Sequence, residues 1–75
     1  MMYVYMNVVY VSLRGYSHGG GRDVLGVFSA RDRAITRCFG EHSLTRSDWW
    51  PTKGRVDHWG NGAGMYVCVV EYSIE

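Results

Sequence analysis

The feature that most constrains this chain is a pair of strand-like segments that are apolar on both faces. In residues 8–13 and again in residues 65–74, valine, leucine and tyrosine occupy both alternating sets of positions. A strand with one face in water alternates apolar with polar residues, so this pattern is typical of strands covered on both sides. With 75 residues, the chain is expected to form a single domain over residues 1–75. A domain of that size has little material left to cover a second sheet face.

Two further elements are indicated between these segments. Residues 23–28 predict a strand that is joined to the first by the glycine-rich turn GYSHGGGR at residues 15–22. Glycine adopts positive φ at little steric cost, so the two strands are expected to form an antiparallel hairpin. Residues 30–39 carry apolar side chains at helical spacing, and Ser29 is of a type that caps helices.

We therefore predict an α+β fold, with a three- to four-stranded antiparallel sheet in the order ββαβ or ββαββ and one helix packed on one face. The optional strand falls at residues 56–59, inside a long irregular segment at residues 41–64. The helix is expected to deliver the last strand beside the first, which makes the first strand central. Val24, Gly26 and Phe28 are expected to share one face of the second strand.

The second face of such a sheet needs a cover, because a bare apolar patch of several hundred Å² invites aggregation. Two candidates arise from the sequence. The segment Trp49–Trp50–Pro51 could fold over it, with one of the two adjacent tryptophans in the core and the other exposed. Alternatively, a second copy of the chain could cover it, and a homodimer is the favoured expectation.

Composition argues against several classes of partner. The formal net charge is +1, so no bulk attraction to nucleic acid or membrane is expected, and a nucleic-acid-binding module ranks third among the functions considered. No stretch approaches the roughly 20 apolar residues of a membrane span, and the first residues lack the features of a signal peptide. We expect a cytoplasmic protein. Cys38 and Cys68 are expected to be buried and reduced, with one bridge as the alternative.

Neither catalysis, nor a cofactor, nor a metal site is expected. The three histidines and two cysteines lack the close spacing of zinc ligands. Asp57 and His58 are neighbours in the sequence and would point to opposite faces of a strand, so they are not expected to form an oriented catalytic pair. We expect a protein that is not an enzyme.

The arginines and tryptophans are the residues that we expect to bind a partner, because both residue types dominate binding hot spots. Binding to another protein is expected to use the exposed face of the helix and the tryptophan-rich segment. The predicted partner-binding residues are Trp49, Trp50, Arg33, Arg37 and Arg46. The alternative is a protein that sequesters a small ligand, such as a nucleotide, at a dimer seam. A glycine run can form an anion-binding nest, so its predicted ligand-binding residues are Tyr16, His18 and Arg22.

Several short motifs occur together between residues 6 and 39. They are VYVS at residues 9–12, GYS at 15–17, GVFS at 26–29 and a charged helix start at 31–34, with EYSI near the end of the chain. This pattern resembles a family of small, mostly uncharacterised phage and bacterial proteins. The resemblance covers roughly half of the chain and implies a phage-associated accessory protein, for which we expect inhibition or modulation of a host or phage protein. If the chain is phage-encoded, its location would be the host cytoplasm.

Overall fold

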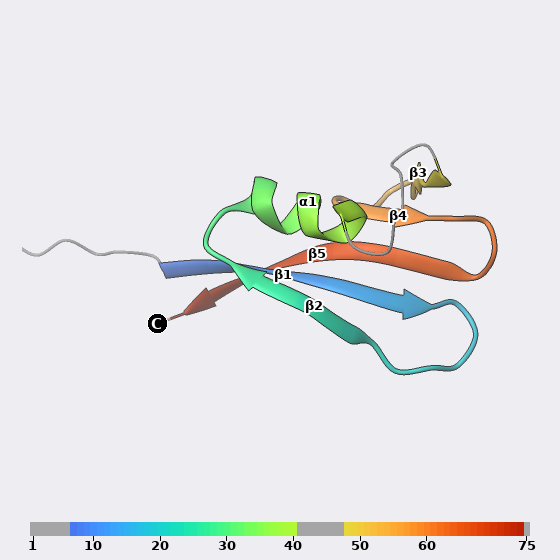
Figure 1. Ribbon diagram of the computed structural model, residues 1–75, viewed down its shortest axis with the longest axis horizontal. Helices are drawn as coiled ribbons and strands as arrows, with labels where there is room; N and C mark the ends of the chain where they lie inside the picture. Colours follow the sequence, from blue (N-terminus) through green and yellow to red (C-terminus); the bar gives the residue numbers. More distant parts are fainter. Residues whose placement is uncertain (1–6, 41–47, 75) are drawn as a thin grey trace, which may run out of the picture.

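The computed structural model describes residues 7–40 and 48–74. Those residues form five strands and one helix, which are β1 (Asn7–Tyr16), β2 (Asp23–Phe28), α1 (Arg31–Gly40), β3 (Trp50–Pro51), β4 (His58–Gly60) and β5 (Met65–Ile74). The strands make an antiparallel sheet in the order β2-β1-β5-β4-β3 (Figure 1). The predicted α+β class is confirmed, with slightly more strands than expected. The last strand also lies beside the first, as predicted.

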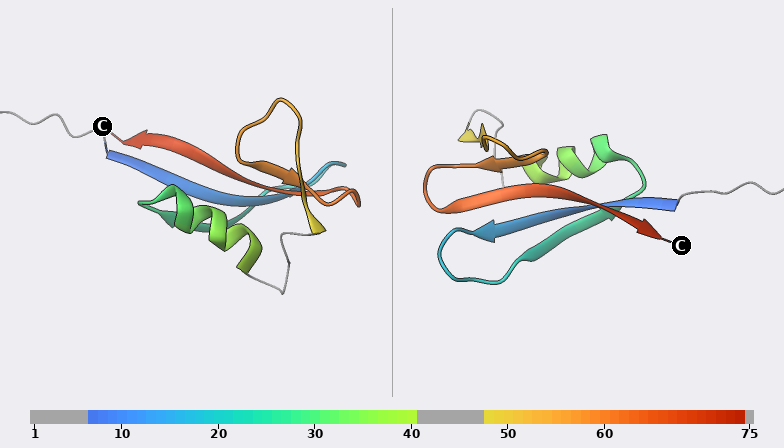
Figure 2. Two further views of the ribbon diagram at one scale, coloured as in Figure 1. Left: turned by 90° about the horizontal axis from the view of Figure 1, so that it is seen from above. Right: turned by 180° about the vertical axis from the view of Figure 1, so that it is seen from behind.

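The helix α1 covers one side of this sheet, which we call the helix face (Figure 2). Ala34 and Cys38 of α1 are buried against Val67 and Val69 of β5. The buried hydroxyl of Ser12 in β1 donates a hydrogen bond of 2.6 Å to the carbonyl oxygen of Ala34. This bond identifies the even-numbered residues of β1 as those that face the helix, because side chains alternate along a strand.

Trp49 completes the core on the helix face. It is 4% exposed and belongs to the same cluster of buried residues as Ala34 and Val67. Its ring meets Phe39 edge to face, with the ring centroids 6.3 Å apart, and Phe39 makes a similar contact with Trp59 at 5.1 Å. Trp49 therefore extends the helix-side core and does not cover the opposite face.

The start of α1 differs slightly from the prediction. The N–H of Ala34 donates to the carbonyl oxygen of Ala30, so Ala30 occupies the N-cap position that was assigned to Ser29. Arg31 forms a two-point ion pair with Asp57, with 2.6 Å between Nε and Oδ2. This pair ties the beginning of the helix to the residue that precedes β4.

Three strand features were not foreseen. β3 contains Pro51, which is tolerated because β3 is at the sheet edge. β4 begins at His58 and not at residue 56, because Asp57 has a φ of 52° and so interrupts the extended chain. A register shift opposite Ser12 and Leu13 pairs Val24 with Leu13, so Val24 does not share a face with Gly26 as expected.

We call the side of the sheet opposite α1 the open face. Its residues pair in rows across the strands, such as Val27–Val11–Val70 and Val24–Leu13–Cys68–His58. In the left view of Figure 2, the connection between β3 and β4 rises on this side. This connection covers one end of the open face. No other described segment packs on the rest of that face. Among those residues, no helix is long and apolar enough to cross a membrane.

Candidate functional site

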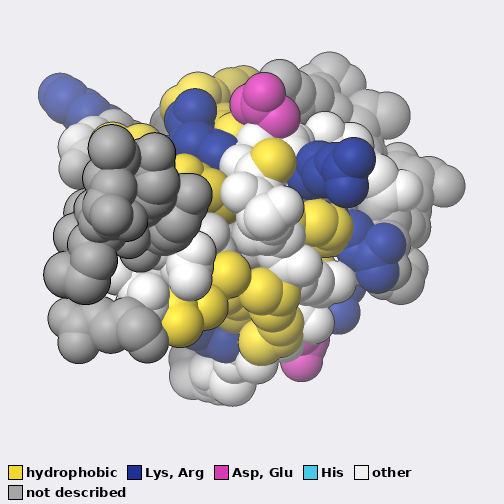
Figure 3. Space-filling view, turned by 90° about the vertical axis from the view of Figure 1, so that its left-hand side faces the viewer, with side chains coloured by type: hydrophobic (Ala, Val, Ile, Leu, Met, Phe, Trp, Pro, Cys, Tyr) yellow, Lys and Arg dark blue, Asp and Glu magenta, His cyan; other side chains and the backbone are white. Residues whose placement is uncertain are grey.

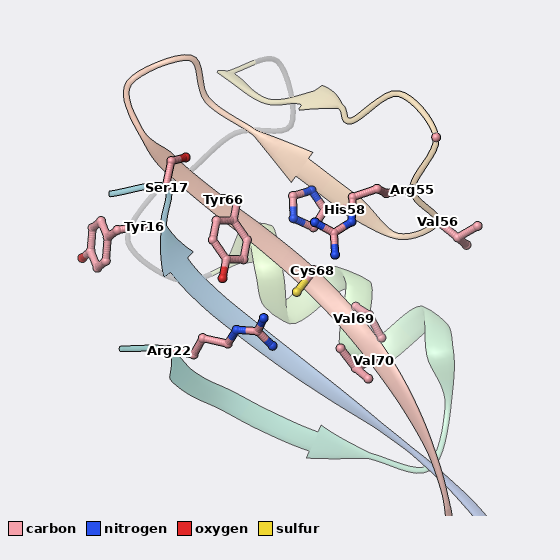
Figure 4. A pocket seen from close by; sticks show the side chains of 11 residues that line it. Tyr16, Ser17, Arg22, Arg55, Val56, His58, Tyr66, Cys68, Val69 and Val70 are labelled. Carbon is pink, nitrogen blue, oxygen red and sulfur yellow. The ribbon is translucent and has the colours of Figure 1, made fainter. Parts of the chain in front are cut away.

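A pocket of about 530 Å³ lies on the open face at the end of the sheet near the β1–β2 turn (Figure 4). One wall comes from that turn and the other from the connection between β3 and β4. The middle of β5 forms the floor. The lining residues are Tyr16, Ser17, Arg22, Gly54, Arg55, Val56, His58, Tyr66, Cys68, Val69 and Val70.

Two stacked aromatic rings, those of His58 and Tyr66, form part of the pocket wall. The rings of His58 and Tyr66 are stacked at 4.8 Å with an interplanar angle of 16°. On its other side Tyr66 occupies the space above Gly15, its partner across the β1–β5 ladder, where a Cβ atom would overlap the ring. Nδ1 of His58 is 2.6 Å from the hydroxyl of Thr52, and this contact fixes the orientation of the imidazole. Neighbouring strands therefore hold both rings in place.

Two arginines give the pocket its charge. In Figure 4 the side chains of Arg22 and Arg55 extend toward Cys68 from opposite sides of the pocket. None of the described residues that line the pocket is acidic, and neither guanidinium forms an ion pair with any residue that the structure describes. Partial burial lowers the pKa of His58, and the positive charges of Arg55 and Arg22 lower it further. The imidazole is therefore neutral near pH 7, and the net charge of the pocket comes from the arginines.

The two cysteines are not joined by a disulfide. The thiol of Cys38 in α1 donates a hydrogen bond of 3.6 Å to the backbone carbonyl oxygen of Cys68, whose side chain points to the open face. Cys68 lines the floor of the pocket, and burial raises its pKa although Arg22 and Arg55 act in the opposite direction. Cys38 belongs to the helix-side core, where burial raises its pKa to about 11. Neither thiol has the lowered pKa of a reactive cysteine.

The chemistry of this pocket is that of a binding site for an anion. Guanidinium groups bind phosphates or carboxylates by two-point contact, and the hydroxyls of Tyr16, Ser17 and Tyr66 can donate further hydrogen bonds. Among the described residues, no group of three or more His, Cys, Asp or Glu side chains could hold a metal ion. Asp57 pairs with Arg31 on the helix side and does not orient His58.

The structure separates the residues of the two predicted sites. Of the ligand-binding residues, Tyr16 and Arg22 line the pocket, whereas His18 lies beside Gly64 outside it. Of the partner-binding residues, Arg33 and Arg37 line a groove of about 410 Å³ along α1 with Phe28.

The two tryptophans have different environments. Trp50 is 62% exposed and pairs with Gly60, whereas Trp49 is buried. The expectation that Trp49 contacts a partner is therefore wrong, because its ring is part of the core. Trp50 follows the alternation of the strands to the open-face side, so it does not share a surface with the arginines of α1. Arg46 lies outside the described residues.

Sequence reasoning missed Arg55, His58 and Tyr66 as pocket residues. The alternation of β5 does place Tyr66 and Cys68 on one face, so part of the signal was present. Arg55 and His58 reach the same place only because the β3–β4 connection folds over the open face.

The fold and the pocket together define a small α+β protein with a positively charged site on the open face of its sheet. No protein-family model, curated protein or solved structure matches the chain. The resemblance to small phage proteins therefore stays a prediction, and the function is argued below from the pocket.

Proposed function

We propose that the protein binds a small phosphorylated ligand, such as a nucleotide, in the pocket on the open face, and that it acts without catalysing a reaction. The observation that carries this proposal is the convergence of Arg22 and Arg55 on a pocket in which none of the described lining residues is acidic. Two like charges that share a partly enclosed site repel each other, and an anion placed between them removes that cost.

The size and the walls of the pocket support a ligand larger than a bare ion. A volume of about 530 Å³ lies within the range of about 300–1,000 Å³ that is typical of small-molecule sites. Tyr16, which is half exposed at the rim, offers a ring on which a planar base can stack. The neutral His58 and the hydroxyl of Tyr66 can bond to sugar or phosphate oxygens.

Calorimetric titration with adenosine monophosphate, adenosine and inorganic phosphate tests this function. Adenosine monophosphate is expected to bind, and adenosine to bind far more weakly, because the arginines recognise the phosphate. Replacing Arg22→Gln or Arg55→Gln should each weaken binding about tenfold or more. Arg33→Gln is the matched control, since it removes an arginine from α1 on the other side of the sheet. Equal binding of adenosine, or equal losses in all three variants, would contradict the proposal.

A second candidate, binding of a host or phage protein, is favoured by the groove on α1. The groove is lined by Phe28, by Arg33 and Arg37 and by one acidic residue, Asp32. Its apolar ring and its excess of positive charge fit a segment with both apolar and acidic side chains. For this function, Arg33→Glu should abolish capture of the partner, whereas Arg22→Gln should not. The opposite result would favour the pocket as the binding site.

A further inference from the structure

The strand β5 continues past the helix, and the two sides of this extension differ in polarity. On the helix face its last residues are Glu71 and Ser73, and Glu71 lies directly opposite Tyr10, whose pKa it raises. On the open face the corresponding residues are Val70, Tyr72 and Ile74. A strand side that faces water is expected to be polar, so this pattern indicates that the open face is the side buried against another layer.

The exposed side chains on the open face form a patch that the described residues leave uncovered. We call this the open-face patch. Val24 and Val27 are 63% and 59% exposed, and Tyr72 and Ile74 are each 50% exposed. Half or more of the surface of each of these residues is therefore exposed, and the largest apolar patch of a typical monomer, about 300–600 Å², is often functional. The half-buried residues Val9, Val11 and Val70 lie between them in the same rows.

Viewed from the end at which β1 begins and β5 finishes, the molecule shows hydrophobic side chains at its surface in several places (Figure 3). None of the residues of the open-face patch is charged. A second copy of the same patch would therefore meet no like charge, which is a requirement for a surface that pairs with itself across a twofold axis.

The edge strands β2 and β3 are protected, whereas residues 70–74 of β5 have no neighbouring strand on the β4 side among the described residues. The register shift opposite Ser12 and Leu13 distorts the edge strand β2, and Nε of Arg37 donates to the carbonyl oxygen of Leu25 at 3.1 Å. The other edge strand, β3, has two residues. A bulge, a covering side chain and a short edge strand are all devices that prevent pairing between sheet edges. Association through β2 or β3 is therefore disfavoured, and the unpaired edge of β5 at residues 70–74 is the edge that competes with the open face.

We propose that the open-face patch is the interface of a homodimer, in which two sheets pack face to face. Two such faces, each with three long strands, would bury on the order of 1,000 Å² in total, close to the smaller stable interfaces at about 1,200 Å². A chain of this length gains little stability from its own core, and association is a common way to supply more. This inference does not depend on ligand binding in the pocket.

Sedimentation equilibrium over a wide range of protein concentration tests the dimer. The wild-type protein should show twice the chain mass, and Val27→Lys or Tyr72→Lys should raise the dissociation constant about tenfold or more. Ser73→Lys is the matched control, because it places the same charge one residue from Tyr72 on the other face of β5. Circular dichroism should show that each variant keeps the fold, since all three positions are exposed.

Hydrogen exchange separates face pairing from edge pairing. In a face-to-face dimer, amide exchange along the outer edge of β2 and along residues 70–74 of β5 should not slow as the protein concentration rises. Slowing of either set of amides with concentration would place the interface at a sheet edge and overturn the proposal. A wild-type protein that remains a single copy at every concentration would also overturn it, as would equal effects of Tyr72→Lys and Ser73→Lys.

Discussion

The ring of Tyr66 lies over Gly15, its direct partner across the β1–β5 ladder, and occupies the space that a side chain at position 15 would need. A Cβ atom there would lie under 3.0 Å from three atoms of Tyr66. The other side of Tyr66 stacks on His58. A glycine in one strand thus sets the position of two pocket residues in the neighbouring strands.

Replacing Gly15→Ala is expected to destabilise the fold by about 1–3 kcal/mol, because the added methyl group forces Tyr66 out of its position. The same displacement should weaken binding of adenosine monophosphate in the pocket. Urea unfolding and calorimetric titration measure the two effects. Gly21→Ala is the control, since no atom lies within 4 Å of a Cβ added there. If both variants unfold alike, the contact between Gly15 and Tyr66 does not hold the pocket.

The hydroxyl of Ser12 supplies a buried hydrogen bond between the sheet and α1. Ser12→Ala is expected to cost about 0.5–1.5 kcal/mol of unfolding free energy, the usual net value of such a bond. Thr36→Ala removes a comparable bond, in which the hydroxyl of Thr36 donates to the carbonyl of Asp32, from an exposed part of α1. That change should stay within about 0.5 kcal/mol. A larger loss for Thr36→Ala than for Ser12→Ala would show that the buried bond is not what joins helix and sheet.

The lowered pKa of His58 predicts that stability depends on pH in the acid range. The unfolded chain takes up a proton on His58 near pH 6.5, whereas the folded protein does so only at lower pH. The unfolding free energy should therefore fall as the pH drops below about 6.5 and level off below the folded pKa. Urea midpoints measured across this range check the effect. His58→Gln should remove this component, and the control His18→Gln should retain it.

A bound phosphate should act on the same histidine in the opposite direction. The anion would compensate the charges of Arg22 and Arg55, which contribute to the lowered pKa of His58. Adding adenosine monophosphate is therefore expected to raise the pKa of His58, as read from its imidazole resonances in a nuclear magnetic resonance titration. An unchanged pKa at saturating ligand would place the bound ligand away from this pocket.

Buried thiols should be protected in the folded protein. The pKa of Cys38 is about 11, and its side chain is 1% exposed, so thiol reagents near pH 8 meet roughly 0.1% thiolate and almost no access. Mass spectrometry should show no rapid modification of Cys38 in buffer and modification of both cysteines in denaturant. Cys68→Ser isolates the reaction of Cys38. Rapid modification of that variant in buffer would show that the helix opens from the sheet.

Part of this architecture follows from local patterns. The boundaries of β2 and β5 and the buried stripe of α1 agree with the predictions, because alternation and helical spacing are properties of neighbouring residues. β3 was missed because a proline does not favour a strand unless it lies at a sheet edge, and that position depends on the whole sheet.

The candidate site was predicted only in part, for a related reason. Tyr16 and Arg22 flank a glycine-rich turn whose chemistry is visible in the sequence. Arg55 and His58 join them only because Asp57, at a φ of 52°, redirects the connection between β3 and β4.

The amino-acid sequence by itself determined that the strands are apolar on both sides, since side-chain chemistry and strand alternation require nothing beyond the order of residues. Only the tertiary structure decided which side each tryptophan occupies and that Trp49 joins the helix-side core. It also decided that the open face combines a charged pocket with an apolar patch. These outcomes depend on contacts between residues distant in the chain, and local spacing carries no information about which distant segments meet.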